Sequence, residues 1–148
     1  YLEVKNVQLE LGSVATDFEH RSFGEELALC QRYFWAQVPL GSATGGAGNS
    51  GQYTLGIGQY LTATQVETVI KFPVQMRAAP SLSSASGASY FVSEAASLSD
   101  YFNSFTAFAA KPQTALIYTT TNVAGTAGLP CRLSAANVNS YLYWDAEL

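Results

Sequence analysis

Alternating apolar and polar positions recur along most of the chain and predict β-strands. Residues 65–72, for example, place Val66, Thr68 and Ile70 on one face and charged side chains on the other. Short strands separated by turn residues are typical of a β-sandwich or barrel. We therefore expect an all-β fold, an antiparallel β-sandwich of jelly-roll type. The predicted strands cover residues 33–38, 52–61, 65–72, 81–84, 89–93, 105–109, 115–120, 131–135 and 141–147.

One short helix is predicted near the N-terminus, over residues 23–31. Ser22 and Glu25 have the S-x-x-E spacing of a capping box, in which each side chain accepts a hydrogen bond from a free backbone N–H of the first turn. The apolar positions that follow at i, i+4 and i+7 are Phe23, Leu27 and Cys30. The pattern indicates an amphipathic helix.

Two further predicted segments are an N-terminal strand and a long loop. Residues 2–11 alternate in polarity and predict an extended strand that Gly12 and Ser13 end, and residues 41–51 form a Gly/Ser/Ala/Asn loop. In the last predicted strand one face carries only apolar side chains, which are Leu142, Trp144, Ala146 and Leu148. The aromatic residues expected in the core are Phe34, Trp35, Phe72 and Trp144.

Charge is scarce in this sequence. Asp, Glu, Lys and Arg make up 12% of the 148 residues, and the net charge is −4. The seven basic residues are scattered along the chain and form no stripe, which disfavours nucleic-acid binding. No apolar run approaches the roughly 18 residues that a membrane-spanning helix needs. A surface this poor in charge suits a secreted or virion-type β protein, or an oligomer that hides much of each subunit.

Residues with metal-binding or nucleophilic chemistry are few. His20 is the only histidine, so a Ser-His-Asp triad has one candidate base, and its charged neighbours suggest a solvated linker. Cys30 and Cys131 are a hundred positions apart, make no zinc site with one histidine, and are expected to be free thiols. No metal or cofactor is expected.

A pair of carboxylates could in principle hydrolyse a glycan. Asp145 and Glu147 lie at i and i+2 of the last strand, about 7 Å apart, which glycosidase geometry permits. A solvated strand face would give the same pattern, and we expect no enzyme activity.

Tyrosine is the more informative residue type, because its ring and hydroxyl match the mixed surface of a sugar and cost little entropy to order. Residues 99–104 bring a carboxylate, a tyrosine and an amide together in what the pattern predicts to be a loop. The competing interpretation of Tyr101 is a hydrophobic anchor of that loop. The candidate glycan-binding residues are Tyr90, Asp100, Tyr101 and Asn103.

Two longer motifs resemble a known family. Residues 7–21 read VQLELGSVATDFEHR and residues 26–34 read ELALCQRYF, and two later segments, FPVQMRAAP at 72–80 and DAEL at 145–148, follow in the same order. Together they resemble the C-terminal region of bacteriophage tail fibre and related tail proteins, where a carbohydrate-binding-module-like jelly roll passes through a linker into the last domain.

This resemblance implies a division of the chain and a role. Residues 1–12 would be the last strand of a preceding carbohydrate-binding-module-like domain, 13–22 a linker and 23–148 the tip domain. The domain would be a homotrimer in the virion tail that attaches to host-surface polysaccharide, with no nucleic-acid partner and no membrane insertion. The variable binding surface is expected in residues 41–51 and 87–126. The alternative is a purely structural module that trimerises or covers the fibre surface without binding a ligand.

Overall fold

The computed structural model describes most of the chain. The described residues are Glu3, 11–14, 16–17, 20–43, 52–96 and 98–147. The predicted N-terminal strand over residues 2–11 lies outside the described residues except at Glu3 and Leu11, and so does the 44–51 part of the predicted loop. The proposed boundary at residue 12 therefore stays a prediction.

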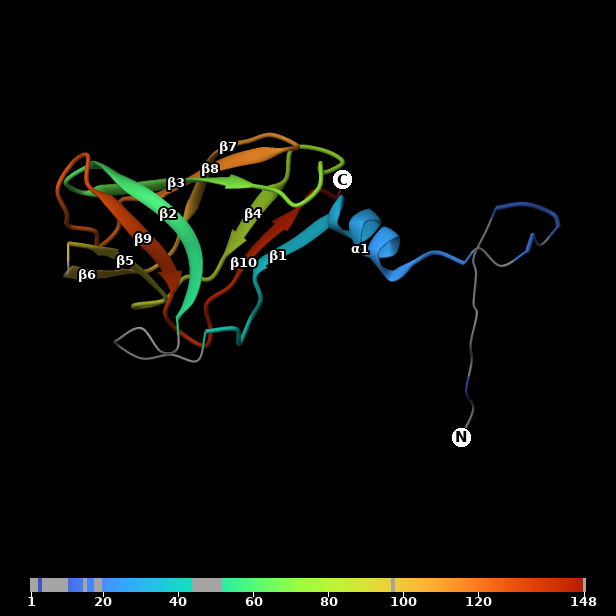
Figure 1. The fold of residues 1–148 in the computed structure, drawn as a ribbon, viewed down its shortest axis with the longest axis horizontal. Helices are drawn as coiled ribbons and strands as arrows, with labels where there is room; N and C mark the ends of the chain where they lie inside the picture. The colour runs from blue at the N-terminus through green and yellow to red at the C-terminus, as the bar shows by residue number, and fades with distance from the viewer. Residues whose placement is uncertain are drawn as a thin grey trace.

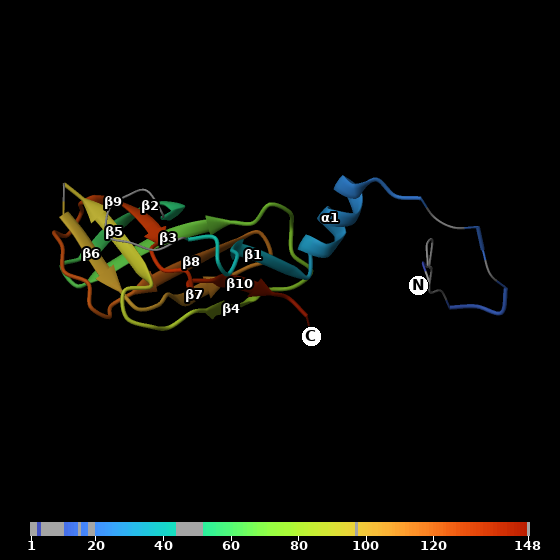
Figure 2. The ribbon, with the colours of Figure 1, turned by 90° about the horizontal axis from the view of Figure 1, so that it is seen from below.

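The described residues form a sandwich of two antiparallel sheets with one short helix at its end (Figures 1 and 2). The smaller sheet has the strand order β1-β10-β4, and the larger has the order β6-β5-β9-β2-β3-β8-β7. The predicted all-β sandwich is confirmed. The elements are α1 (Phe23–Gln31), β1 (Phe34–Val38), β2 (Tyr53–Thr62), β3 (Gln65–Lys71), β4 (Ser81–Ser84), β5 (Phe91–Ala95), β6 (Leu98–Phe102), β7 (Thr106–Ala110), β8 (Thr114–Thr119), β9 (Pro130–Ala135) and β10 (Leu142–Asp145).

The core lies between the sheets and is rich in aromatic rings. Trp144 is fully buried, and the ring of Phe72 contacts both Trp144 and Trp35 at centroid distances of 5.1 and 5.8 Å. A second cluster joins Phe91, Phe102 and Phe105 at 4.9 to 5.8 Å. Edge-on and stacked ring pairs of this kind contribute beyond their buried area.

One core prediction was wrong. Phe34 was expected inside, but it precedes Trp35 on the same strand and alternation sends the two rings to opposite faces, so Phe34 is 47% exposed. The register between β1 and β10 explains which of the two rings is buried. Trp35 pairs with the buried Trp144, whereas Phe34 pairs with the exposed Asp145. The β10 prediction is confirmed at Leu142, Trp144 and Ala146, all buried.

A strand is present where the sequence predicted a loop. Residues 98–102 form β6, which pairs along its whole length with β5 and ends the larger sheet. The segment has few β-branched residues, and Ser99 and Asp100 are turn-forming types, so its local sequence favoured a loop. Burial of Phe102 against Phe91 outweighs that preference.

The predicted helix and its capping box are confirmed. Ser22 Oγ accepts a hydrogen bond from the Glu25 N–H at 3.3 Å, and the Ser22 N–H donates to Glu25 Oε2 at 2.9 Å. The Ser22 backbone N–H, followed by its hydroxyl, holds the pKa of Glu25 below its ordinary value. The helix buries none of its residues, however, and Phe23 is 82% exposed.

The two cysteines are free, as predicted. Cys30 is exposed on α1, whereas Cys131 is buried in β9, where loss of hydration raises the pKa of the thiol to about 11. The inner thiol therefore stays protonated at neutral pH. Among the described residues, no helix is long and apolar enough to span a membrane.

Candidate functional site

The four predicted glycan-binding residues are close together in the sequence, but their side chains do not converge on one surface. Asp100 and Tyr101 are neighbours in β6, so their side chains point to opposite faces of the sheet. Asp100 Oδ2 accepts a hydrogen bond from the Ala124 N–H, and Asn103 Oδ1 accepts one from Asn122 at 3.5 Å. Both side chains therefore hold the 121–126 connection in place.

The two tyrosines of that set are partly covered. Tyr90 packs against the core, and its ring lies so close to Gly87 that an added Cβ there would be 2.5 Å from it. Tyr101 pairs across the strands with the fully buried Val92 and is itself half-buried. A hydrophobic anchoring role suits both rings.

A second aromatic surface lies on the outer face of the three-stranded sheet. The Tyr141 and Tyr143 rings are stacked at 4.6 Å between centroids and 27° between planes, and Phe34 meets Tyr143 at 5.5 Å. We call these three residues the aromatic row. Its rings lie on the face opposite Leu142 and Trp144, which are both fully buried.

Polar groups accompany the aromatic row. Tyr143 pairs with Ser83 of β4, and its hydroxyl accepts a hydrogen bond from the Leu40 N–H at 3.2 Å. Ser81, two residues earlier on the same strand face, pairs with Asp145. The surface thus combines apolar ring area with hydroxyl groups, which is the combination that binds a sugar.

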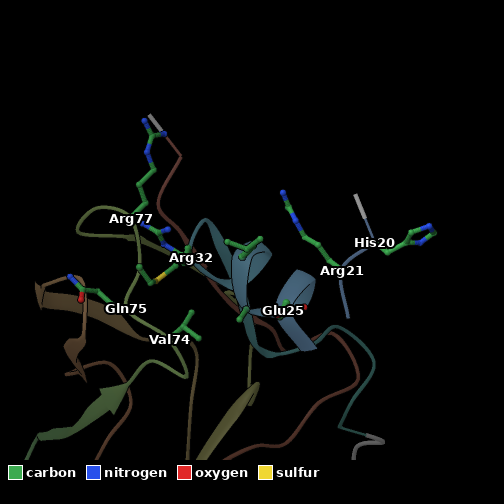
Figure 3. Close-up of a pocket in the computed structure, with 10 residues that line it drawn as sticks. His20, Arg21, Glu25, Arg32, Val74, Gln75 and Arg77 are labelled. Carbon is green, nitrogen blue, oxygen red and sulfur yellow. The ribbon is translucent and has the colours of Figure 1, made fainter. Parts of the chain in front are cut away.

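A hollow of about 780 Å³ lies between α1 and the segment that follows β3 (Figure 3). We call it the basic hollow. Residues from the helix and the segment before it form one wall, and residues of 74–77 form the other. The lining residues are His20, Arg21, Glu25, Ala28, Leu29, Arg32, Val74, Gln75, Met76 and Arg77.

The basic hollow concentrates the positive charge of the chain. Arg21, Arg32 and Arg77 are three of the seven basic residues of the whole sequence. Arg21 pairs with Glu26 at 3.4 Å, and the Arg77 guanidinium lies over the Tyr33 ring, 5.5 Å from its centroid. No role could be assigned to these residues from the sequence alone, because they are spread along the chain and only the fold brings them together.

The carboxylates considered for catalysis lie outside this hollow. Asp145 Oδ1 accepts a hydrogen bond from the Glu147 N–H at 2.8 Å, and both residues are exposed at the end of β10. On the larger sheet, the carboxylate of Glu94 accepts a hydrogen bond from Arg132 Nε at 2.7 Å, and the two residues are paired across β5 and β9. Within the described ranges, no group of three or more His, Cys, Asp and Glu side chains is placed to hold a metal ion.

Comparison with known proteins gave no relative. No family model, no curated protein and no solved structure matches the chain.

Proposed function

We propose that this chain is a non-catalytic distal domain of a phage tail fibre, a virion protein that attaches to polysaccharide on the host surface. The observation that carries the proposal is the aromatic row of Phe34, Tyr141 and Tyr143 with its neighbouring hydroxyls. The resemblance of residues 7–21, 26–34, 72–80 and 145–148 to tail fibre proteins supports the proposal separately.

The aromatic row suits a glycan for energetic reasons. The rings stand on a sheet whose other face is the buried core, so they are ordered before any ligand arrives and lose little entropy on binding. Rigid tyrosine contacts of this kind supply much of the affinity of binding surfaces. Several weak sites on one oligomer would give a higher overall affinity through avidity.

Replacing Tyr141 with alanine is expected to weaken glycan binding about tenfold, the cost of removing one well-placed aromatic anchor. Tyr141 lies outside the regular part of β10, so the sheet ladder stays intact. A glycan array would identify the bound saccharide, and titration of that saccharide would give the affinity of each variant.

Phe108→Ala is the matched control, because Phe108 is 75% exposed on β7 of the other sheet. It should leave the affinity unchanged. Equal affinity of Tyr141→Ala and the unsubstituted chain would show that the aromatic row does not bind the glycan. Absence of binding to any host polysaccharide would favour the structural module instead.

A structural, self-associating role is the second candidate, and the outer face of α1 favours it. Phe23 is 82% and Leu27 44% exposed, and Cys30 continues the same helix face. Apolar side chains at this spacing are typical of helices that pack on other helices. We propose that three copies associate through this face.

Light scattering should therefore give a mass near three times the 15.8 kDa of one chain. Leu27→Ser is expected to shift the mass to that of one chain, because it puts a hydroxyl in the apolar face while removing no buried contact from the monomer. Leu29→Ser, on the side of α1 that lines the basic hollow, is the control and should leave the mass unchanged. A single-chain mass for the unsubstituted protein would contradict the proposed association of three copies.

A further inference from the structure

The basic hollow departs from the neutral character of the rest of the chain. Only 12% of the residues are charged and the net charge is −4, yet three arginines line one hollow together with His20. Arg32 comes from the C-terminal end of α1 and Arg77 from the segment after β3, so the fold, and not a run of basic sequence, gathers them.

The carboxylates near the hollow have other partners. Glu25 Oε2 accepts hydrogen bonds from the Ser22 N–H and hydroxyl, both at 2.9 Å, and Glu26 accepts from Arg21. Arg32 and Arg77 form no ion pair with a carboxylate in the part of the chain that the structure describes. Their positive charge is therefore left for a ligand.

Arg32 and Arg77 are also held near each other by the backbone. The Arg77 N–H donates to the Arg32 carbonyl oxygen at 2.7 Å, which joins the end of α1 to the 74–77 segment. The Arg77 guanidinium lies over the Tyr33 ring, 5.5 Å from its centroid, and a guanidinium in a cation–π contact can still donate N–H groups to an anion. Two N–H groups of one guanidinium can bind two oxygens of a carboxylate or phosphate at once.

We propose that the basic hollow binds an oxyanion, a carboxylate or phosphate, carried by an acidic saccharide. Arg32 and Arg77 bind the anion. Ala28 and Val74 give the adjoining sugar ring apolar contacts, and the Gln75 amide is available to its hydroxyls. A volume of about 780 Å³ accommodates one or two sugar rings, since ligand sites commonly span about 300–1,000 Å³. The saccharide as the source of the anion rests on the proposed function, whereas the anion site rests on the arginines alone.

The test titrates the full chain with three defined probes. Trigalacturonate carries carboxylates, a short glycerol-phosphate oligomer carries phosphates, and maltotriose is neutral. Calorimetry gives the affinities, and the NMR signals of the arginine Nε–H groups report which guanidinium is engaged. We expect one acidic probe to bind and to shift the Arg32 and Arg77 signals, and the probe that binds identifies the anion.

Arg32→Gln combined with Arg77→Gln is expected to weaken that binding at least about tenfold, because two charge-assisted contacts are lost. Lys71→Gln combined with Lys111→Gln removes the same charge from exposed residues that do not line the hollow and should change the affinity less than about twofold, as expected for screened charges that make no contact with the ligand. Circular dichroism would test whether both double variants are folded.

Failure of the site and failure of the proposed function give different results. Equal weakening in both double variants, or no binding of either acidic probe, would overturn the anion site. A host polysaccharide that binds with Tyr141-dependent affinity while the arginine variants bind it normally would overturn the site and leave the proposed function standing. Binding of an acidic probe that depends on Arg32 and Arg77 but not on Tyr141 would support the site without the aromatic row.

Discussion

Replacing Trp144 with alanine is expected to lower the free energy of unfolding by about 4 kcal/mol, within the range for large aromatic-to-alanine changes in a core. Trp144 is fully buried, and its ring meets Phe72 edge-on at 5.1 Å. Its indole Nε1–H donates to Gln37 Oε1 at 2.9 Å. The substitution therefore opens a cavity and also removes the donor to Gln37, which is only 8% exposed.

Urea denaturation followed by circular dichroism would measure this loss. Trp144→Phe separates the two contributions, because it keeps an aromatic ring and removes only the hydrogen bond and part of the volume. We expect it to cost about 1–2 kcal/mol, close to the cost of leaving one buried polar group unsatisfied. A loss below about 1 kcal/mol for Trp144→Ala would show that the two sheets do not depend on this contact.

Local signals in the sequence were enough to predict the helix and most strands. The capping box needs only Ser22 and Glu25 at the right spacing, and the alternation in β3 needs only its own residues. Both features depend on neighbours in sequence, which a single chain displays directly. The bounds of α1 accordingly agree with the prediction.

Features that depend on pairing between distant segments could not be predicted. Residues 98–102 became β6 through contacts with β5, and Phe34 was turned outward by the pairing of Trp35 with Trp144. For the same reason the loop predicted around Tyr101 is wrong, because Asp100 and Tyr101 belong to a strand. Tertiary contacts outweigh β-propensity in such cases.

The aromatic row and the basic hollow also depend on pairing between distant segments, so neither could be predicted in full from the sequence. The pattern of the last strand placed Tyr141 and Tyr143 on one outward face, but only the register of β1 brings Phe34 beside them. Arg32 and Arg77 are 45 positions apart in sequence, and their proximity follows from one backbone hydrogen bond between them. The hollow lies outside residues 41–51 and 87–126, where a variable binding surface was expected.

A second large loss of stability is expected for Gly58→Ala, about 3 kcal/mol, at the upper end for overpacking a core. Gly58 lies in the middle of β2 and pairs with Cys131 of β9. A Cβ at this position would be 2.5 Å from the Glu67 carbonyl oxygen and 2.6 Å from Leu133 Cδ1. The first contact is with the backbone of β3, so relief requires the strands themselves to move.

Gly24→Ala is the matched control, because an added Cβ there meets nothing within 4 Å and alanine favours the helical conformation of α1. Thermal or urea unfolding should show no loss for this variant. Combining Gly58→Ala with Leu133→Ala removes one of the two clashes and leaves the carbonyl contact in place. If the added Cβ acts as described, Gly58→Ala therefore costs less in the Leu133→Ala background than alone, but still more than Gly24→Ala. A Gly58→Ala variant as stable as Gly24→Ala would instead mean that β2 and β3 are not held at this separation, because only a movement of one strand could admit the methyl group without cost.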